Sequence, residues 1–186
     1  MASVDDVAAA ILERTGTVAT NKLQKLLYYA QAWHLVLNNK KIFSNRIEAR
    51  AQGPVVPDLQ HQQKRNFEVS QWNKGNPTRL SSSERETVDW VARQYGEFSA
   101  EALANMTRME MSWVVAGEEI DLRQMASYYS RQRSSPAVAV SQVVASTAIE
   151  GISLDDEWQE RLWEVASGEV SADEVIAEEI RRARDA

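Results

Sequence analysis

The chain has 186 residues, of which 44% are hydrophobic and 26% are charged, with a formal net charge of −6 at pH 7. This composition is typical of a globular protein with one medium domain, alone or with a small appendage. The absence of cysteine excludes disulfides, thiol catalysis and cysteine-based zinc sites. No run of about 18 apolar residues occurs and the acidic start, MASVDD, is unlike a secretory signal, so we expect a cytoplasmic protein without membrane contact.

Helical patterns dominate the first 40 or so residues. Ser3 and Asp6 have the spacing of a capping box, and Gly16 can end the helix that follows. A second, longer helix carries an apolar stripe from Leu23 onward and is predicted to end at residues 38–39.

The stretch IFSNRIEARAQGPVVPDL breaks the helical pattern. Apolar and polar residues alternate over 47–51, which is typical of a short strand. Gly53 and Pro54 predict a turn, and Pro57 excludes a central strand after it. We therefore expect one or two short strands in a small sheet.

The middle of the chain is predicted to return to helix after a loop over 66–82. Ser83 and Glu86 form a second capping-box pattern, before a helix that Gly96 can end. Shorter helices are expected over residues 99–106, 111–117 and 121–132.

The polar stretch RQRSSPAV, with Pro136, is the clearest boundary in the sequence. We predict a domain over 1–133 and a separate module of three helices over 137–186. The first of these helices covers 137–150, Ser153 caps the second, which Gly168 can end, and a capping box of Ser171 and Glu174 opens the third.

Charge differs across this boundary. Residues 137–186 contain 12 acidic and 4 basic residues, a net charge of −8. Of the chain's 27 acidic and 21 basic residues, this leaves 15 and 17 for residues 1–136, a net charge of +2. The acidic part is either a surface for a basic protein partner or a solvated helical face.

No motif for catalysis or cofactor binding is found: GxGxxG, GxxxxGK[ST], GxSxG and HExxH are all absent. His34 and His61 have no ligand-like spacing, and His34 lies on an apolar helix face, where a packed histidine is the simpler interpretation. We therefore expect neither an enzyme nor a cofactor or metal site.

One carboxylate stands out in the sequence STAIEG, residues 146–151. Ser146 and Glu150 share one face of a helix, and Gly151 ends it, so Glu150 lies at the negative end of the helix dipole. The unfavourable interaction of a carboxylate with this end of the dipole costs only ~0.3–1 kcal/mol of helix stability. Two interpretations remain open on physical grounds: a tolerated surface glutamate, or a carboxylate that pairs with a cation on another molecule.

The sequence from residue 142 onward resembles the VbhA-type antitoxins that inhibit Fic toxins. Ser146, Glu150 and Gly151 match the inhibitory (S/T)xxxE(G/N) motif, and SGEVS over 167–171 matches a second landmark. The resemblance implies that the glutamate pairs with an arginine of a Fic enzyme, which would otherwise hold the γ-phosphate of ATP during AMP transfer. The chain lacks the HPFxxGN motif of the Fic enzyme itself. We expect the toxin to be contacted by Val143, Thr147, Leu154, Trp158 and Leu162.

The first part of the chain resembles the Panacea antitoxin domain, which includes SocA-like proteins. The resemblance is carried by NKLQKLLYYAQAWHLVLNNKKIF at 21–43, IEARAQGPVVPDL at 47–59 and LANMTRMEMSW at 103–113, with Arg108 and Ser112 departing from the usual histidine and proline. It implies a toxin-binding module without catalysis. The motif positions are Leu23, Lys25, Leu26, Tyr28, Tyr29, Trp33, His34, Gly53, Pro54, Pro57 and Trp113.

Together these patterns predict a mainly α protein: a helical Panacea-like domain with a small β element, followed by a small three-helix module. The predicted function is that of an antitoxin, in a heterodimer or higher complex with a Fic toxin, which blocks productive ATP binding. An alternative is a proteolytic adaptor or prophage regulatory module that binds a different toxin. A net charge of −6 makes binding to nucleic acid the least favoured option.

Overall fold

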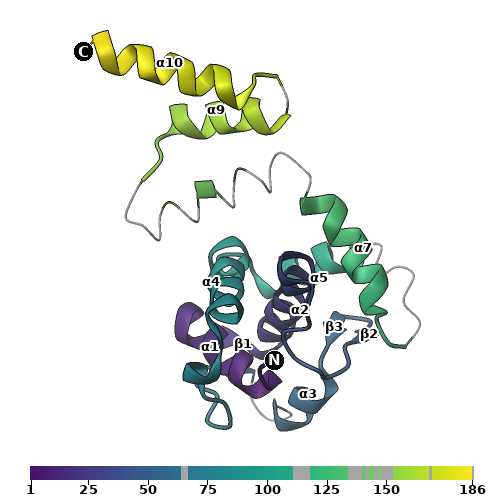
Figure 1. The fold of residues 1–186 in the computed structure, drawn as a ribbon. Coiled ribbons are helices and arrows are strands. Elements are labelled where there is room, and N and C mark those ends of the chain that lie inside the picture. Colours follow the sequence, from purple (N-terminus) through teal and green to yellow (C-terminus); the bar gives the residue numbers. More distant parts are fainter. Residues whose placement is uncertain are drawn as a thin grey trace. The chain divides into compact units, whose positions relative to one another are not determined.

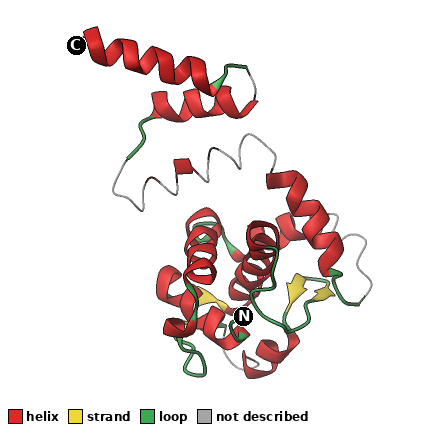
Figure 2. Cartoon of the chain, viewed as in Figure 1, coloured by secondary structure: helices red, strands yellow, loops and turns green. Residues whose placement is uncertain are grey.

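The computed structural model describes residues 1–63, 67–110, 118–133, 140, 143–144, 147, 153–167 and 169–185. Its contacts divide the chain into two compact units, Met1–Ser130 and Arg131–Ala186, here called the N-terminal and C-terminal units. Most described residues are helical and two short two-stranded sheets accompany them, so the prediction of a mainly α fold with a small β element is confirmed (Figure 2).

The elements follow one another in the order that Figure 1 shows. The helices are α1 (Val4–Thr15), α2 (Thr20–Asn38), α3 (Pro57–Gln63), the 3₁₀ turn η1 (Pro77–Arg79), α4 (Ser82–Tyr95), α5 (Ala100–Met109), α7 (Leu122–Arg133), α9 (Asp156–Ser167) and α10 (Ala172–Asp185). The strands are β1 (Val18–Ala19), β2 (Glu48–Arg50), β3 (Gly53–Val55) and β4 (Glu68–Val69).

Helix α2 is the centre of the N-terminal unit. Every residue from 23 to 34 is buried, polar ones included. The helix packs against α1, α4 and α5 and against strand β3, and Figure 1 shows it between α4 and the β2–β3 hairpin. A helix that is buried on all sides must satisfy its polar side chains inside the protein, and this requirement shapes the site described below.

Serine caps begin three helices of this unit. Ser3 Oγ accepts from the Asp6 backbone N–H at 3.1 Å, as predicted, and Ser99 Oγ accepts from Ala102 N–H at 3.1 Å before α5. The predicted capping box of Ser83 and Glu86 is wrong: Ser81 and Glu84 form it, and α4 starts at Ser82. Both pairs have the required spacing, but Glu84 also accepts from Ala2 N–H at 2.9 Å, so a contact with the start of the chain selects the earlier pair.

The β2–β3 hairpin corrects a second prediction. Gly53 and Pro54 lie in strand β3, and the turn is formed by Ala51 and Gln52. Arg50 pairs with Gly53 and Glu48 with Val55 in an antiparallel register. A strand accepts proline only at a position where pairing does not need the backbone N–H. The local sequence does not reveal that Pro54 occupies such a position.

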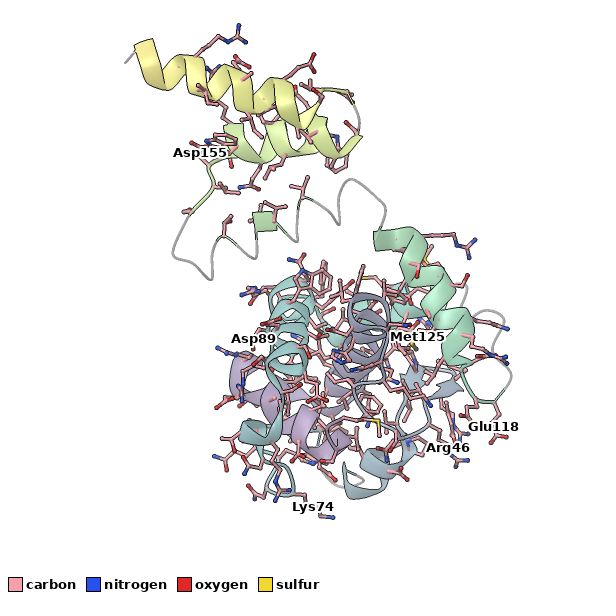
Figure 3. The ribbon with its side chains drawn as sticks, viewed as in Figure 1. Arg46, Lys74, Asp89, Glu118, Met125 and Asp155 are labelled. Carbon is pink, nitrogen blue, oxygen red and sulfur yellow. The ribbon has the colours of Figure 1, made fainter. Side chains whose placement is uncertain are left out.

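The stretch predicted as a loop over 66–82 also contains ordered structure. Strand β4 pairs with β1, Val18 opposite Val69, and η1 follows further along. These strands are two residues long, too short for a periodic pattern to reveal them. Further along, α7 agrees with the helix predicted over 121–132, and its Met125 is fully buried (Figure 3). The helix predicted over 111–117 lies outside the described residues.

The C-terminal unit contains α9 and α10. The reciprocal capping box before α10 is confirmed, because Ser171 Oγ accepts from Glu174 N–H at 3.2 Å and Glu174 Oε2 accepts from Ser171 N–H at 3.0 Å. Before α9, Asp155 takes the role predicted for Ser153: its Oδ1 accepts from Trp158 N–H at 2.9 Å (Figure 3). Leu154 therefore precedes the helix that was predicted to carry it.

Only part of the first predicted C-terminal helix is described. Residues 140, 143, 144 and 147 are helical, and Thr147 Oγ1 donates to Val143 O at 3.1 Å, four residues back. The rest of 137–150 lies outside the described residues, so the first of the three helices predicted for this module stays a prediction. None of the helices within the described residues is long and apolar enough to cross a membrane.

Candidate functional site

Seven of the predicted Panacea positions lie along α2, and all of them are buried. They are at most 3% exposed: Leu23, Lys25, Leu26, Tyr28, Tyr29, Trp33 and His34. Gly53 and Pro54 are buried on β3, and Pro57 is buried as the first residue of α3. These side chains therefore build the interior of the N-terminal unit and do not form an exposed docking face. Trp113 lies outside the described residues.

Two glutamines that were not predicted as functional connect α2 to the neighbouring loops. Gln24 Oε1 accepts from Val56 N–H at 2.8 Å, at the end of the hairpin. Gln31 Oε1 accepts from the N–H groups of Ile42 and Phe43, at 3.1 and 3.3 Å. One sequence signal could have revealed Gln24 and Gln31. They are uncharged polar residues in a helix that is apolar on its other faces.

His34 is part of the packed interior. Its side chain is 3% exposed, and Nδ1 lies 2.8 Å from Thr87 Oγ1 and 3.1 Å from Asn38 Nδ2. Burial lowers the pKa of His34, which favours the neutral ring. Within the described residues, no three His, Asp or Glu side chains are grouped closely enough to hold a metal ion.

A buried carboxyl group links α2 to α7. Glu110, directly after α5, is 7% exposed, and its Oε2 accepts from Tyr28 OH at 2.5 Å and from Tyr129 OH at 2.7 Å. Burial raises the pKa of Glu110 to about 7, although the two hydroxyl donors act in the opposite direction. Glu110 was not among the predicted functional residues, although it is the glutamate of the TRMEMSW stretch.

Aromatic rings surround this carboxyl group. Tyr29 stacks on Tyr95 with ring centroids 3.9 Å apart, and Trp33 Nε1 donates to Tyr95 OH at 3.0 Å. Tyr129 of α7 contacts Trp33 edge to face, at 5.2 Å. The tyrosine and tryptophan side chains thus hold α2, α4 and α7 together, which fits a packing role for them.

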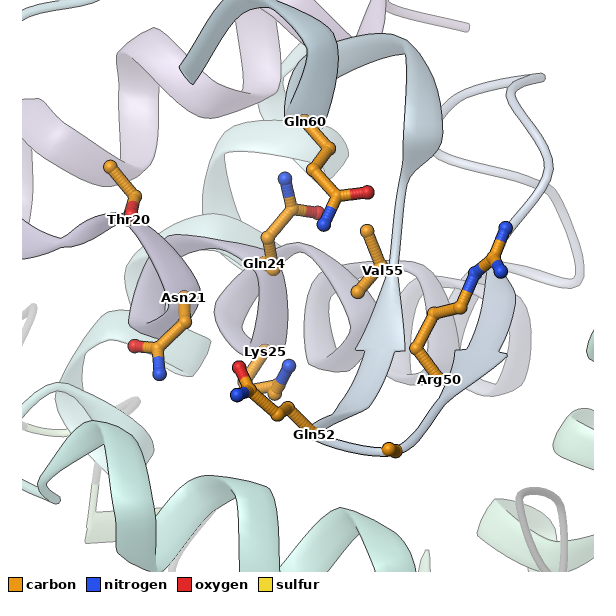
Figure 4. Close-up of a pocket in the computed structure, with 9 residues that line it drawn as sticks. Thr20, Asn21, Gln24, Lys25, Arg50, Gln52, Val55 and Gln60 are labelled. Atoms are coloured by element: carbon orange, nitrogen blue, oxygen red, sulfur yellow. The ribbon is translucent and has the colours of Figure 1, made fainter. Parts of the chain in front are cut away.

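A cavity of about 710 Å³ opens between the N-terminal half of α2 and the β2–β3 hairpin (Figure 4). Asn21, Gln24 and Lys25 line it from α2, Gln52 from the hairpin turn and Gln60 from α3. The figure shows the Gln24 and Gln60 side chains close together and the Lys25 side chain beside Gln52. Its volume is in the usual range of ligand pockets, roughly 300–1,000 Å³.

Lys25 is an unusual residue for the wall of a cavity. Its side chain is 1% exposed, and Nζ donates to Pro54 O at 3.0 Å. Burial, and to a lesser extent the charge of Arg108, lowers the pKa of Lys25 to about 8. The structure therefore brings together three predicted Panacea positions, Lys25, Gly53 and Pro54, which the sequence separates by more than 25 residues.

Gly53 allows this close approach. Its φ of 93° is rarely adopted by other residues, and a Cβ there would lie 2.9 Å from Lys25 Cε and 3.0 Å from Thr107 Oγ1. Gly53→Ala is expected to lower the free energy of unfolding by about 1–3 kcal/mol, because it adds both backbone strain and a steric clash. Urea denaturation measures the change.

Gly16→Ala is the matched control for this prediction. Gly16 also has a positive φ, 67°, but no atom lies within 4 Å of the position that a Cβ would take. The Gly16 variant should therefore report backbone strain alone. Equal losses of stability in the two variants would show that the contact with Lys25 and Thr107 has no effect.

Large apolar side chains are exposed on the C-terminal unit. Trp158 and Trp163 of α9 are 36% and 45% exposed, and Ile176 and Ile180 of α10 are 57% and 49% exposed. Among the described residues of this unit, Val175 is the only buried hydrophobic one, at 8%. The two helices therefore share little core and present apolar surface.

Ion pairs join the two helices. Arg161 of α9 lies 2.9 Å from Glu178 of α10, and Arg182 of α10 lies 3.3 Å from Glu157 of α9, while Arg182 also pairs with Glu178 within α10 at 3.1 Å. Exposed pairs of this kind contribute little each, roughly 0–1 kcal/mol, so they orient the helices more than they stabilise them.

The predicted toxin-contacting residues are only partly accessible. Val143 is 40% exposed, and Trp158 is exposed as described above, while Thr147, Leu154 and Leu162 are half-buried. Ser146, Glu150 and Gly151, the predicted inhibitory motif, lie outside the described residues.

Within the described residues, the N-terminal unit has an open cavity beside Lys25, and the C-terminal unit has exposed apolar side chains. Residues 23–114 match the family model described as "Antitoxin SocA-like, Panacea domain". The N-terminal unit therefore contains a Panacea domain, as predicted, and this supports an antitoxin role with a toxin as partner. No match to the chain was found among curated proteins or among solved structures.

Proposed function

We propose that this chain is the antitoxin of a toxin–antitoxin pair and that residues 137–186 neutralise a Fic-type toxin that transfers AMP. The observation that carries the proposal is the exposed apolar surface of α9 and α10, next to a stretch with the (S/T)xxxE(G/N) motif. Two helices with four exposed large apolar side chains and little shared core gain stability by burying these side chains against a partner.

Charge supports a protein partner with a basic surface. Residues 137–186 carry a net charge of −8, and Glu157 and Glu178 already pair with arginines of the same unit. Glu150 stands apart from these pairs in the sequence, at the end of the segment 137–150. Complementary charge speeds association and orients the partner more than it adds affinity.

In this proposal Glu150 acts by replacing a phosphate group. A carboxylate offers two oxygens to a guanidinium group, much as a phosphate does, and such pairs form two parallel hydrogen bonds. If Glu150 pairs with the arginine that would hold the γ-phosphate of ATP, the nucleotide is held in another position. Its transferred phosphate then does not lie in line with the hydroxyl to be modified. The chain itself then needs neither catalytic residues nor a cofactor.

Co-purification tests which part of the chain binds. We expect residues 137–186, expressed with a protein that has the HPFxxGN motif, to co-purify with it as the full chain does. Residues 1–133 are the matched control and should not retain the protein by themselves. Retention by 1–133 alone would contradict the proposal and favour an adaptor in which the Panacea domain binds the toxin.

A further inference from the structure

We propose that the cavity between α2 and the β2–β3 hairpin, here called the Lys25 cavity, binds a carboxylate group of a partner polypeptide. This is a binding function of the N-terminal unit, and it does not depend on the proposed inhibition of a Fic toxin. It rests on the charge at the base of the cavity, on the chemistry of its rim and on its position at the start of α2.

The first observation is a buried cation without an ionic partner. The Lys25 side chain is 1% exposed, and within the described residues no carboxylate lies at ion-pair distance from its Nζ. The hydrogen bond to Pro54 O satisfies one of three ammonium donors. Burying an unpaired charge is unfavourable, so an anion in the cavity would gain more here than at an exposed lysine.

The other charges near the cavity favour an anion as well. No Asp or Glu is among the described residues that line it. Arg108, the charged neighbour that lowers the pKa of Lys25, is a second cation, and its Nη1 donates to Ala51 O at 3.2 Å in the hairpin turn. Arg50 also lines the cavity, but it pairs with Glu48 and points along the hairpin (Figure 4).

The N-terminus of α2 adds to the positive electrostatic potential in the cavity. Thr20 and Asn21, in the first turn of the helix, line the cavity. The preceding residue, Ala19, provides no side-chain cap, and the first turn contains no acidic residue. The N-terminus of a 19-residue helix therefore contributes its partial positive charge to the cavity.

The rim favours a polypeptide over a nucleotide. Asn21, Gln52 and Gln60 are exposed at the cavity, and their amide groups can both donate to and accept from peptide groups. No aromatic side chain is among the described lining residues, so a base would have no ring on which to stack. One buried ammonium also matches a single carboxylate better than a polyphosphate.

Such a carboxylate could belong to a chain terminus or to an Asp or Glu side chain, and short peptides distinguish the two. The full-length protein, with lysine labelled at ¹³Cε, is titrated with N-acetyl-Ala-Ala-Ala, with the C-terminal amide of the same peptide, with N-acetyl-Ala-Asp-Ala amide and with inorganic phosphate. We expect one of the two carboxylate peptides to bind and the uncharged amide to bind at least about tenfold more weakly. On binding, the pKa of Lys25 should rise from about 8 toward 10.5.

Lys25→Met tests the role of the charge, and Lys22→Met is the matched control on the same helix. Lys22 does not line the cavity, and it donates to Gly96 O instead. We expect Lys25→Met to weaken peptide binding at least about tenfold and Lys22→Met to leave it unchanged. Because it removes a buried charge, Lys25→Met should also unfold at a higher temperature.

Asn21→Asp keeps the test decisive if Lys25→Met does not fold. The added carboxylate lies in the first turn of α2, where it favours the helix, and it should repel a second carboxylate in the cavity. Four results would each overturn the proposal. The acid and amide peptides could bind equally well, or both cavity variants could bind as tightly as the natural protein. The third is that no peptide binds at millimolar concentration, and the fourth is that phosphate binds in preference to the peptides. No toxin is present in this experiment, so its failure is separate from a failure of the Fic assay.

Discussion

Glu150→Gly in the full chain is expected to leave its complex with a Fic toxin almost intact and to raise AMP transfer by the bound toxin on the order of 100-fold. Binding should persist because the exposed side chains of α9 and α10, Trp158 and Ile176 among them, provide much more area than one carboxylate. Inhibition should fail because Ser146 is neutral and Asp155 caps α9, so neither can replace Glu150 at the γ-phosphate arginine. The measurements are labelled-AMP incorporation and the dissociation constant of the purified complex.

Trp158→Ala is the complementary variant. Trp158 is 36% exposed in the free protein, and its loss should weaken the complex by about 2 kcal/mol, the usual scale of a central aromatic contact. At saturating antitoxin this variant should still inhibit AMP transfer. If Glu150→Gly remains fully inhibitory while binding is intact, the module blocks the toxin by its bulk; if Glu150→Gly no longer binds, Glu150 is an anchor and the division of roles is wrong.

The second large effect concerns Glu110 and the pH dependence of stability. Its pKa is about 7 in the folded protein and 4.5 without the influence of the fold, so the folded state binds this proton more tightly than the unfolded chain. The stabilisation from Glu110 is therefore fully present below about pH 4.5 and is lost as the pH rises through about 7. We expect the free energy of unfolding to fall by about 3 kcal/mol across this window.

Glu110→Gln removes the titrating group but keeps an oxygen that can accept from Tyr28 and Tyr129. Urea denaturation from about pH 5 to about pH 8 measures the free energy of unfolding at each pH. Over this range it should fall much less for this variant than for the natural protein. The control is Glu101→Gln, at an exposed glutamate of the preceding helix α5, and its stability should fall with pH as that of the natural protein does. An unchanged pH dependence in Glu110→Gln would show that another group is responsible.

Several features of this chain follow from local sequence. The spacing of apolar residues predicted α2, and short-range hydrogen bonds of Ser3 and Ser171 produced the caps that their sequence context indicated. The motif at residues 23–34 pointed to a Panacea domain, and the family match confirms it over 23–114. These predictions succeeded because the interactions that determine them span four residues or fewer, or recur at helical spacing.

Tertiary contacts decided the remaining features. Two capping boxes were possible near residue 82, and the carboxylate of Glu84 selected one because it also binds the N-terminal ammonium group, at 3.2 Å. Gly53 and Pro54 lie in a strand that pairs with β2, and Lys25 of α2 donates to the Pro54 carbonyl and leaves no room for a Cβ at Gly53. The Lys25 cavity and the Glu110 cluster likewise combine residues from distant segments. Sequence periodicity determined that α2 is a helix, but only the packing of the hairpin, α5 and α7 around it decided which of its polar residues are buried, and burial is what gives Lys25 and Glu110 their chemistry.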